Sequence, residues 1–185
     1  PTAPGKYTAY FMLVNQNGVR FGTGSDAKGA FWANIEVTQA KNVFYSFASE
    51  ACKASWSSNA AGTLSCPGKT KDVNIGYVIP QGEPIREDGA KENEPGLITR
   101  PDNTAAGYIT GYYPFVAIKN GDRFKATVMC EGGMTNCDIY FTLQYRIGSE
   151  PVQTLGQWHE VNEGKWTRVD IDLSALAGQN VQFIL

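Results

Sequence analysis

The sequence predicts an all-β protein, folded as an antiparallel β-sandwich. Apolar and polar residues alternate with a period of two in many short segments, as they do in strands with one buried face. Turn residues separate these segments, and the 185 residues include 20 Gly and 9 Pro. No stretch has a convincing helical pattern, and Ser174 to Ala177 is at most one helical turn.

Residues 1–39 are interpreted as a partial immunoglobulin-like segment. Residues 6–14 are rich in aromatic and β-branched side chains and lead into Asn17-Gly18. Because an Asn-Gly pair between apolar runs is typical of a β-hairpin, we expect residues 6–14 to pair with residues 19–22. Alternation at residues 31–37 predicts a further strand.

Residues 40–185 are interpreted as a jelly-roll-like sandwich. Alternating or apolar runs predict strands at residues 43–47, 73–79, 123–130, 138–147 and 168–173. Residues 80–104 break this pattern, because they combine several Pro, Gly and Glu residues without alternation. We expect this segment to form a long loop, which in a compact domain is usually functional or mobile.

The four cysteines lie in two close pairs, which favours two local disulfides, Cys52–Cys66 and Cys130–Cys137. Such disulfides indicate an oxidised, extracellular protein, secreted or held at the cell surface. A zinc site made of four thiolates is the alternative, but neither pair has a CxxC-like spacing. The chain begins with Pro1 rather than Met, so we expect either that a leader was removed or that this is a piece of a longer protein.

Charge and hydropathy narrow the range of partners. The 16 basic and 18 acidic residues give a net charge of -2, which excludes strong electrostatic attraction to nucleic acid or to an anionic membrane. No apolar run reaches the roughly 20 residues that span a bilayer. His159 is the only histidine of the chain. The sequence contains no nucleophile motif such as Gly-x-Ser-x-Gly that His159 could serve as a base, so we expect His159 to lie on the surface or to line a pocket.

Carboxylates are the other candidates for acid–base chemistry. Several crowd the long loop, and Asp170 and Asp172 share one strand face, where we expect a solvated ion pair with Arg168. We therefore assign no catalytic residue, predict no enzyme activity and expect no cofactor. We keep a structural calcium site as an alternative, because Glu87-Asp88-Gly89 and Asp102-Asn103 offer oxygen ligands in loops. Neither segment matches an EF-hand.

Two portions of the chain resemble known families. Residues 4–37 contain Pro-Gly-x-Tyr before a strand, the Asn-Gly hairpin, Phe-Gly, and Phe31-Trp32 at the start of the last strand. They resemble the second half of the four-tryptophan domain of autophagy receptors, an immunoglobulin-like sandwich that also occurs in secreted bacterial proteins, although Tyr10-Phe11 replaces its usual aromatic-Trp pair. The resemblance implies that partner strands are missing, either because the chain is a fragment or because a neighbouring copy supplies them.

Residues 107–185 resemble secreted bacterial jelly-roll modules of the carbohydrate-binding kind. The resemblance rests on residues 166–185, where a strand ending in Asp-Leu-Ser-x-Leu-Ala-Gly precedes a second apolar strand. The whole arrangement is similar to extracellular proteins of Chloroflexota-like bacteria. It implies a fold and a location outside the cell more than an activity.

Aromatic residues give the strongest indication of function. Flat rings flanked by Asn, Gln and Asp suit sugars, because the rings contact the C–H faces while the polar groups bind the hydroxyls. The alternative is that these rings fill the core. We expect Trp56 to be an exposed platform that its disulfide loop restrains before binding. The other candidates are Tyr108, Tyr112, Tyr113 and Trp158.

We therefore expect a non-catalytic extracellular module that binds a glycan or cell-envelope polymer through these five aromatic residues. The alternative is a self-assembling structural subunit of a surface layer or extracellular filament, joined by strand addition at incomplete N- and C-terminal sheets. A hydrolase that uses the loop carboxylates is the third hypothesis.

Overall fold

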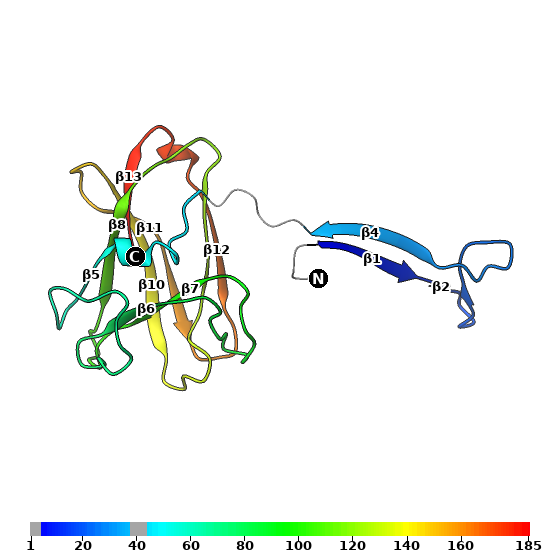
Figure 1. Ribbon diagram of the computed structural model, residues 1–185, viewed down its shortest axis with the longest axis horizontal. Coiled ribbons are helices and arrows are strands. Elements are labelled where there is room, and N and C mark those ends of the chain that lie inside the picture. Colours follow the sequence, from blue (N-terminus) through cyan, green and yellow to red (C-terminus); the bar gives the residue numbers. More distant parts are fainter. Residues whose placement is uncertain (1–4, 38–43) are drawn as a thin grey trace. The chain divides into compact units, whose positions relative to one another are not determined.

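The computed structural model describes residues 5–37 and 44–185, and nearly all of its regular structure is antiparallel β-sheet. The predicted all-β class is therefore confirmed. The chain divides into two compact units, Pro1–Tyr45 and Ser46–Leu185, which we describe separately (Figure 1). The boundary predicted between residues 39 and 40 lies outside the described residues.

The first unit is built on an antiparallel ribbon of two strands, β1 (Gly5–Phe11) and β4 (Phe31–Val37). The strands β2 (Leu13–Val14) and β3 (Arg20–Phe21) form a short hairpin. The predicted turn is present, and the Asn15 side-chain oxygen accepts hydrogen bonds from the backbone N–H groups of Asn17 (2.9 Å) and Val19 (3.0 Å).

The predicted pairing of residues 6–14 with residues 19–22 is right only for Leu13–Val14, because β1 pairs with β4 instead. A tight loop follows β3, closed by backbone hydrogen bonds between Thr23 and Gly29. At Gly22 an added Cβ would lie 1.9 Å from the carbonyl oxygen of Gly29, so the chain can close the loop there only with glycine.

The second unit contains a five-stranded sheet with the strand order β11-β10-β13-β8-β5. Its strands are β5 (Ser55–Ser58), β8 (Ile109–Ala117), β10 (Asp138–Ile147), β11 (Gln153–Val161) and β13 (Asn180–Ile184). The remaining strands form two antiparallel pairs, β9 (Arg123–Val128) with β12 (Thr167–Asp172) and β6 (Tyr77–Gln81) with β7 (Gly96–Arg100). Two short 3-10 turns are η1 (Ala51–Lys53) and η2 (Ser174–Leu176).

An aromatic core joins the β9–β12 pair to the five-stranded sheet. Phe124 of β9 lies 6.3 Å from Phe183 of β13, measured between ring centroids. Phe47 contacts both rings and also Tyr113 of β8 edge to face, at 5.2, 5.4 and 4.9 Å. Such edge-to-face contacts favour a specific packing of large rings. The second unit is therefore a sandwich with its core between these two layers.

Two strand predictions and one loop prediction need correction. Residues 44–47 contain no strand, because the chain turns there and the backbone N–H of Glu50 bonds the carbonyl of Ser46 (2.9 Å). Residues 73–76 also belong to a turn, which ends at Gly76 with a φ of 84°, so that β6 begins only at Tyr77. The predicted loop 80–104 contains β7, whose apolar and β-branched residues Leu97-Ile98-Thr99 pair with β6.

Both predicted disulfides are present, and they fit an extracellular or otherwise non-cytoplasmic protein. The predicted open C-terminal sheet is wrong. β13 lies between β10 and β8 and pairs with both, and Val181, Phe183 and Ile184 are buried. These residues form an apolar run because the strand is central, so β13 offers no edge to another chain.

Candidate functional site

Trp56 does not form the exposed platform that the sequence predicts. Its side chain is only 2% exposed, and its indole nitrogen donates a 2.7 Å hydrogen bond to the carbonyl of Ala51. Trp56 lies opposite Gly111 of β8, where an added Cβ would come within 2.4 Å of the indole ring. Glycine at that position leaves the space that the indole fills, which is why the ring lies in the core.

Tyr113 and Trp158 also face inward. Tyr113 is fully buried, and its hydroxyl donates a hydrogen bond to the carbonyl of Phe47 (3.1 Å). Trp158 is half-buried on β11, and its ring covers Gly156, where an added Cβ would lie 2.6 Å from the indole. The prediction that Tyr113 belongs to a binding surface is therefore wrong, because its ring fills the core. The Trp158 ring is only partly covered, so its role in binding stays a prediction.

Tyr108 and Tyr112 are exposed, to 54% and 38%. A β-bulge determines the direction of Tyr112. In the pairing of β8 with β13, Tyr112 lies opposite Ile184 and Phe115 lies opposite Gln182, so one residue of β13 faces two of β8. This extra residue places Tyr112 and Phe115 on the same side of the sheet although they are three positions apart.

We call the side of the five-stranded sheet that faces away from the aromatic core the outer face. Strand alternation and register place on it Ser55, Ser57, Tyr112, Phe115, Tyr140, Thr142, Gln144, Arg146, Thr154, Gln157, His159, Gln182 and the buried Ile184. Of the five predicted site residues, Tyr112 is the one that belongs to this set. The signal for the other members was available in the alternation of residues 138–147, which puts Tyr140 on the polar side.

Cross-strand hydrogen bonds hold the polar groups of the outer face. The Gln157 amide donates to the Thr142 hydroxyl (3.0 Å), and the Gln144 amide donates to the Thr154 hydroxyl (3.4 Å). The Arg146 Nε donates to the Gln182 side-chain oxygen (2.7 Å). These pairs fix the rotamers of long side chains, which lowers the entropy lost when a ligand binds.

At one end of the outer face, the rings of Tyr140 and His159 stack at a centroid distance of 4.4 Å and an interplanar angle of 12°. His159 Nε2 lies 2.7 Å from a carboxylate oxygen of Asp138. His159 therefore lies on the surface beside an exposed aromatic ring, one of the two positions that the sequence predicts for it.

A cavity of about 560 Å³ opens beside the first disulfide. Its lining includes Cys52, Cys66, Ser55, Ser57, Thr63 and Tyr112. The volume falls within the range of small-molecule sites. On the other side of Tyr112, the guanidinium carbon of Arg146 lies 5.8 Å from the centre of the tyrosine ring. Tyr112 thus connects the cavity to the polar groups of the outer face.

The loop carboxylates proposed as calcium ligands are engaged by protein donors. The backbone N–H of Ala90 and the Arg86 guanidinium lower the pKa of Asp88 below its ordinary value. The hydroxyl of Thr104, followed by its backbone N–H and the Asn59 amide, lowers the pKa of Asp102. Among residues 5–37 and 44–185, no group of three or more His, Cys, Asp or Glu side chains is placed to hold a metal ion.

The predicted partner of Asp170 and Asp172 is wrong. Both carboxylates pair with Arg123, at 2.6 Å and 3.3 Å, rather than with Arg168. The register explains this, because Arg123 of β9 lies directly opposite Asp172 of β12. Both carboxylates are exposed, and Lys125 is a second cation beside Asp170, at 3.7 Å.

Comparison with known protein families, with curated proteins and with solved structures finds no match to this chain. No helix in the described part of the chain is long and apolar enough to cross a membrane. Function is therefore inferred from the surfaces themselves.

Proposed function

We propose that the protein is a non-catalytic extracellular module that binds a glycan or cell-envelope polymer on the outer face. One observation carries the proposal: the exposed ring of Tyr112 lies between a cavity and a row of oriented polar side chains. The two disulfides fit the location.

The chemistry of the outer face suits a sugar. The Tyr112 ring offers an apolar surface for the C–H groups of a pyranose. The hydroxyls of Ser55 and Ser57 line the cavity on one side of it, and the amides of Gln144 and Gln182 lie on the other. Such a mixture of one ring and several hydroxyl and amide groups is typical of sites that orient a polar ligand over an apolar patch.

The test compares Tyr112→Ala and Tyr112→Phe in binding of the whole chain to a glycan array and to insoluble cell-envelope polymers. Stacking needs the ring and not its hydroxyl, so the Phe variant should retain binding while the Ala variant loses at least tenfold in affinity. Thermal unfolding of both variants controls for damage to the fold. Absence of binding to every polymer tested, or equal binding by the Ala variant, would contradict the proposal.

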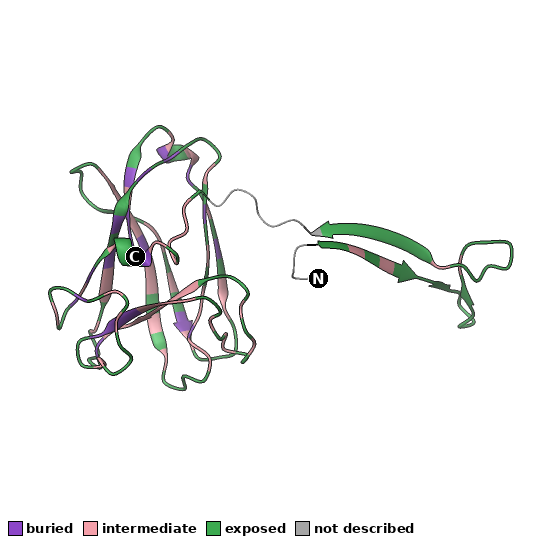
Figure 2. Ribbon diagram, viewed as in Figure 1, coloured by how far each residue is buried: buried purple, intermediate pink, exposed green. Residues whose placement is uncertain are grey.

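A second candidate is self-assembly through the β1–β4 ribbon. In residues 5–37, ten large apolar side chains are exposed, including Tyr10 (71%) and its cross-strand neighbour Trp32 (64%). Figure 2 shows β4 in the colour of exposed residues. An isolated two-stranded ribbon is at best marginally stable in water, and exposed apolar patches of this kind usually mark an interaction site.

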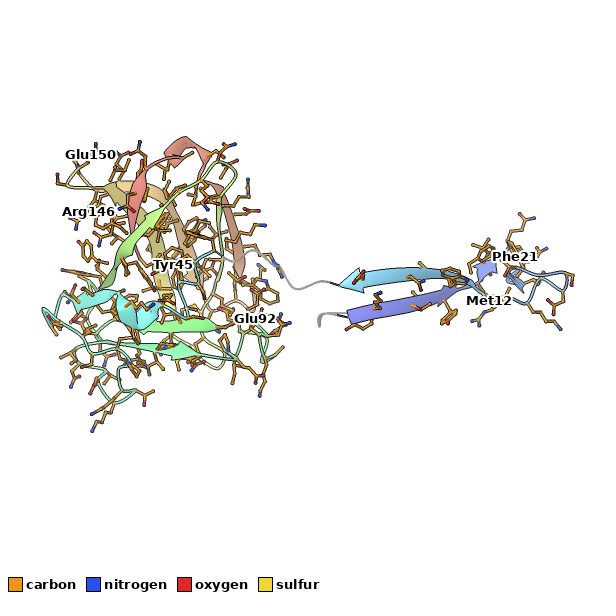
Figure 3. The ribbon with its side chains drawn as sticks, turned by 45° about the horizontal axis from the view of Figure 1, so that its top comes forward. Met12, Phe21, Tyr45, Glu92, Arg146 and Glu150 are labelled. Carbon is orange, nitrogen blue, oxygen red and sulfur yellow. A yellow bond between two sulfur atoms is a disulfide. The ribbon has the colours of Figure 1, made fainter. Side chains whose placement is uncertain are left out.

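The two edges of the ribbon favour strand addition. Within the described ranges, β1 and β4 pair only with each other, so each has an open outer edge. One face carries the cross-strand pair Tyr10 and Trp32, and Figure 3 labels Met12 and Phe21 at the β2–β3 end. A second copy that adds its own strands would pair these edges and cover this face.

Size-exclusion chromatography with light scattering tests this candidate. The wild-type chain should form oligomers or filaments, and the double variant Tyr10→Lys/Trp32→Lys should be monomeric. The same substitutions at the exposed residues Tyr108 and Tyr140 of the second unit are the control and should leave assembly unchanged. A monomeric wild-type chain at tens of micromolar concentration would count against assembly.

A further inference from the structure

We infer that the ligand of the outer face is an acidic polysaccharide, whose sugar carboxylate pairs with the guanidinium of Arg146. The inference rests on the proposed function and names its class of ligand. It starts from Arg146 on β10, which Figure 3 labels. Its guanidinium lies near the ring of Tyr112.

The position of Arg146 is fixed by two contacts. Its Nε donates a 2.7 Å hydrogen bond to Gln182 on the adjacent strand β13. Its guanidinium carbon lies 5.8 Å from the centre of the Tyr112 ring on the next strand, β8. Arg146 is half-buried, and these two contacts hold its guanidinium beside Gln182 and the Tyr112 ring.

The charge of Arg146 is not compensated within the described chain. Arg86 and Arg123 each form an ion pair, with Asp88 at 2.9 Å and with Asp170 at 2.6 Å. For Arg146, by contrast, no carboxylate of the described residues lies within ion-pair distance, and its two terminal nitrogens form no hydrogen bond there. The donors of Nη1 and Nη2 are thus available to a ligand.

The available donors select an anion. Two parallel N–H groups of a guanidinium match the two oxygens of a carboxylate, which gives stronger and more directional bonds than a neutral hydroxyl would. A glycan that leaves the cavity and crosses Tyr112 reaches Arg146 next, because Tyr112 contacts both. A uronic acid at this point of the chain places its carboxylate opposite the guanidinium.

General attraction to polyanions does not explain such binding. The chain has a net charge of -2, and Asp138 lies at the far end of the outer face. Recognition of an acidic glycan therefore depends on the local pair with Arg146. Its affinity should fall with ionic strength as expected for one or two ion pairs, and much less steeply than for a basic polyelectrolyte-binding surface.

The test measures binding of the full chain to polygalacturonate, alginate and hyaluronate, and to the same polymers after their carboxylates are reduced to alcohols. Wild type should bind at least one acidic polymer at least tenfold more tightly than its reduced form. Arg146→Gln should remove this preference, whereas Arg146→Lys should retain part of it. Arg168→Gln, which removes the same charge from an exposed position on β12, is the matched control and should bind like wild type.

The outcomes separate the inference from the proposed function. Equal binding of an acidic polymer and its reduced form, or an unchanged preference in Arg146→Gln, overturns the acidic ligand but leaves glycan binding intact. Binding of none of the six polymers by wild type overturns the acidic ligand and also counts against the proposed function. Thermal unfolding of each variant ensures that a loss of binding is not a loss of fold.

Discussion

Tyr112 and Tyr113 are adjacent in β8 and face opposite sides of the five-stranded sheet. The Tyr112 side chain is on the outer face beside the cavity, while Tyr113 is enclosed by Trp56 and Phe47 in the aromatic core. One ring is therefore available to a ligand, and its neighbour stabilises the sandwich.

This difference predicts opposite effects of the same substitution. Tyr113→Ala should reduce the free energy of unfolding by about 3–5 kcal/mol, because it leaves a cavity among packed rings. Tyr112→Ala should change stability by less than about 1 kcal/mol and instead weaken glycan binding. Urea unfolding and binding assays on both variants measure this. Comparable stability losses for the two variants would show that Tyr112 belongs to the core.

The close contact between Gly111 and Trp56 gives a second prediction. Gly111→Ala places a methyl group against the indole, and the overpacking should cost about 1–3 kcal/mol of unfolding free energy. At Gly82 an added Cβ meets nothing within 4 Å, so Gly82→Ala should be nearly neutral. The urea midpoints of the two variants measure this difference, provided that the slope of the unfolding free energy against urea concentration is the same for both. Two equally stable variants would mean that Trp56 moves aside easily.

The two disulfides should each stabilise the folded chain. Cys52 and Cys66 are 14 positions apart, and Cys130 and Cys137 are 7 apart. Replacing either pair by serine should therefore cost about 2–3 kcal/mol, with the longer loop losing slightly more. Thermal unfolding of the two double variants measures this, and thiol titration of the unfolded wild type should find no free thiol before reduction.

The stability of the protein should fall in acid. The hydroxyl and the backbone N–H of Ser174 lower the pKa of Asp172, and the donors from Thr104 and Asn59 lower that of Asp102 below the ordinary 3.8. A carboxyl whose pKa is lowered by folding stabilises the folded state above its unfolded pKa. This contribution disappears as the pH falls from about 4 through the lower folded pKa.

Asp102→Asn tests this prediction, because asparagine does not titrate. Urea midpoints between pH 6 and pH 3 should decline less steeply for the variant than for wild type, although the variant is less stable at pH 6. Parallel curves for the two proteins would mean that Asp102 does not contribute to acid sensitivity.

Strand alternation predicts most of the fold because each period-two segment has one buried side. Residues 123–128 and 138–147 form strands as predicted, and Phe124 faces the core. Strand predictions from local sequence patterns are wrong where packing against distant residues determines the structure. Residues 44–47 have the composition of a strand, yet Phe47 is held by rings from three distant strands rather than by pairing with a neighbour.

The residues of the proposed binding site are harder to predict, because the exposure of an aromatic ring depends on which residue lies opposite it. The sequence shows that Trp56 belongs to a disulfide loop, but it does not show that Gly111 faces it across the sheet. Similarly, the bulge that turns Tyr112 outward arises from the pairing of β8 with β13, about 70 positions later in the chain. Predicting either feature requires knowledge of the register between strands.

The central position of β13 has a consequence for biosynthesis. β8 and β10 are each hydrogen-bonded to β13 and not to each other, although both precede it in the sequence. While the chain emerges from the ribosome, these two strands have no neighbour on that side until residues 180–184 have been translated. We therefore expect the sheet to close late, only after β13 has been inserted between β8 and β10.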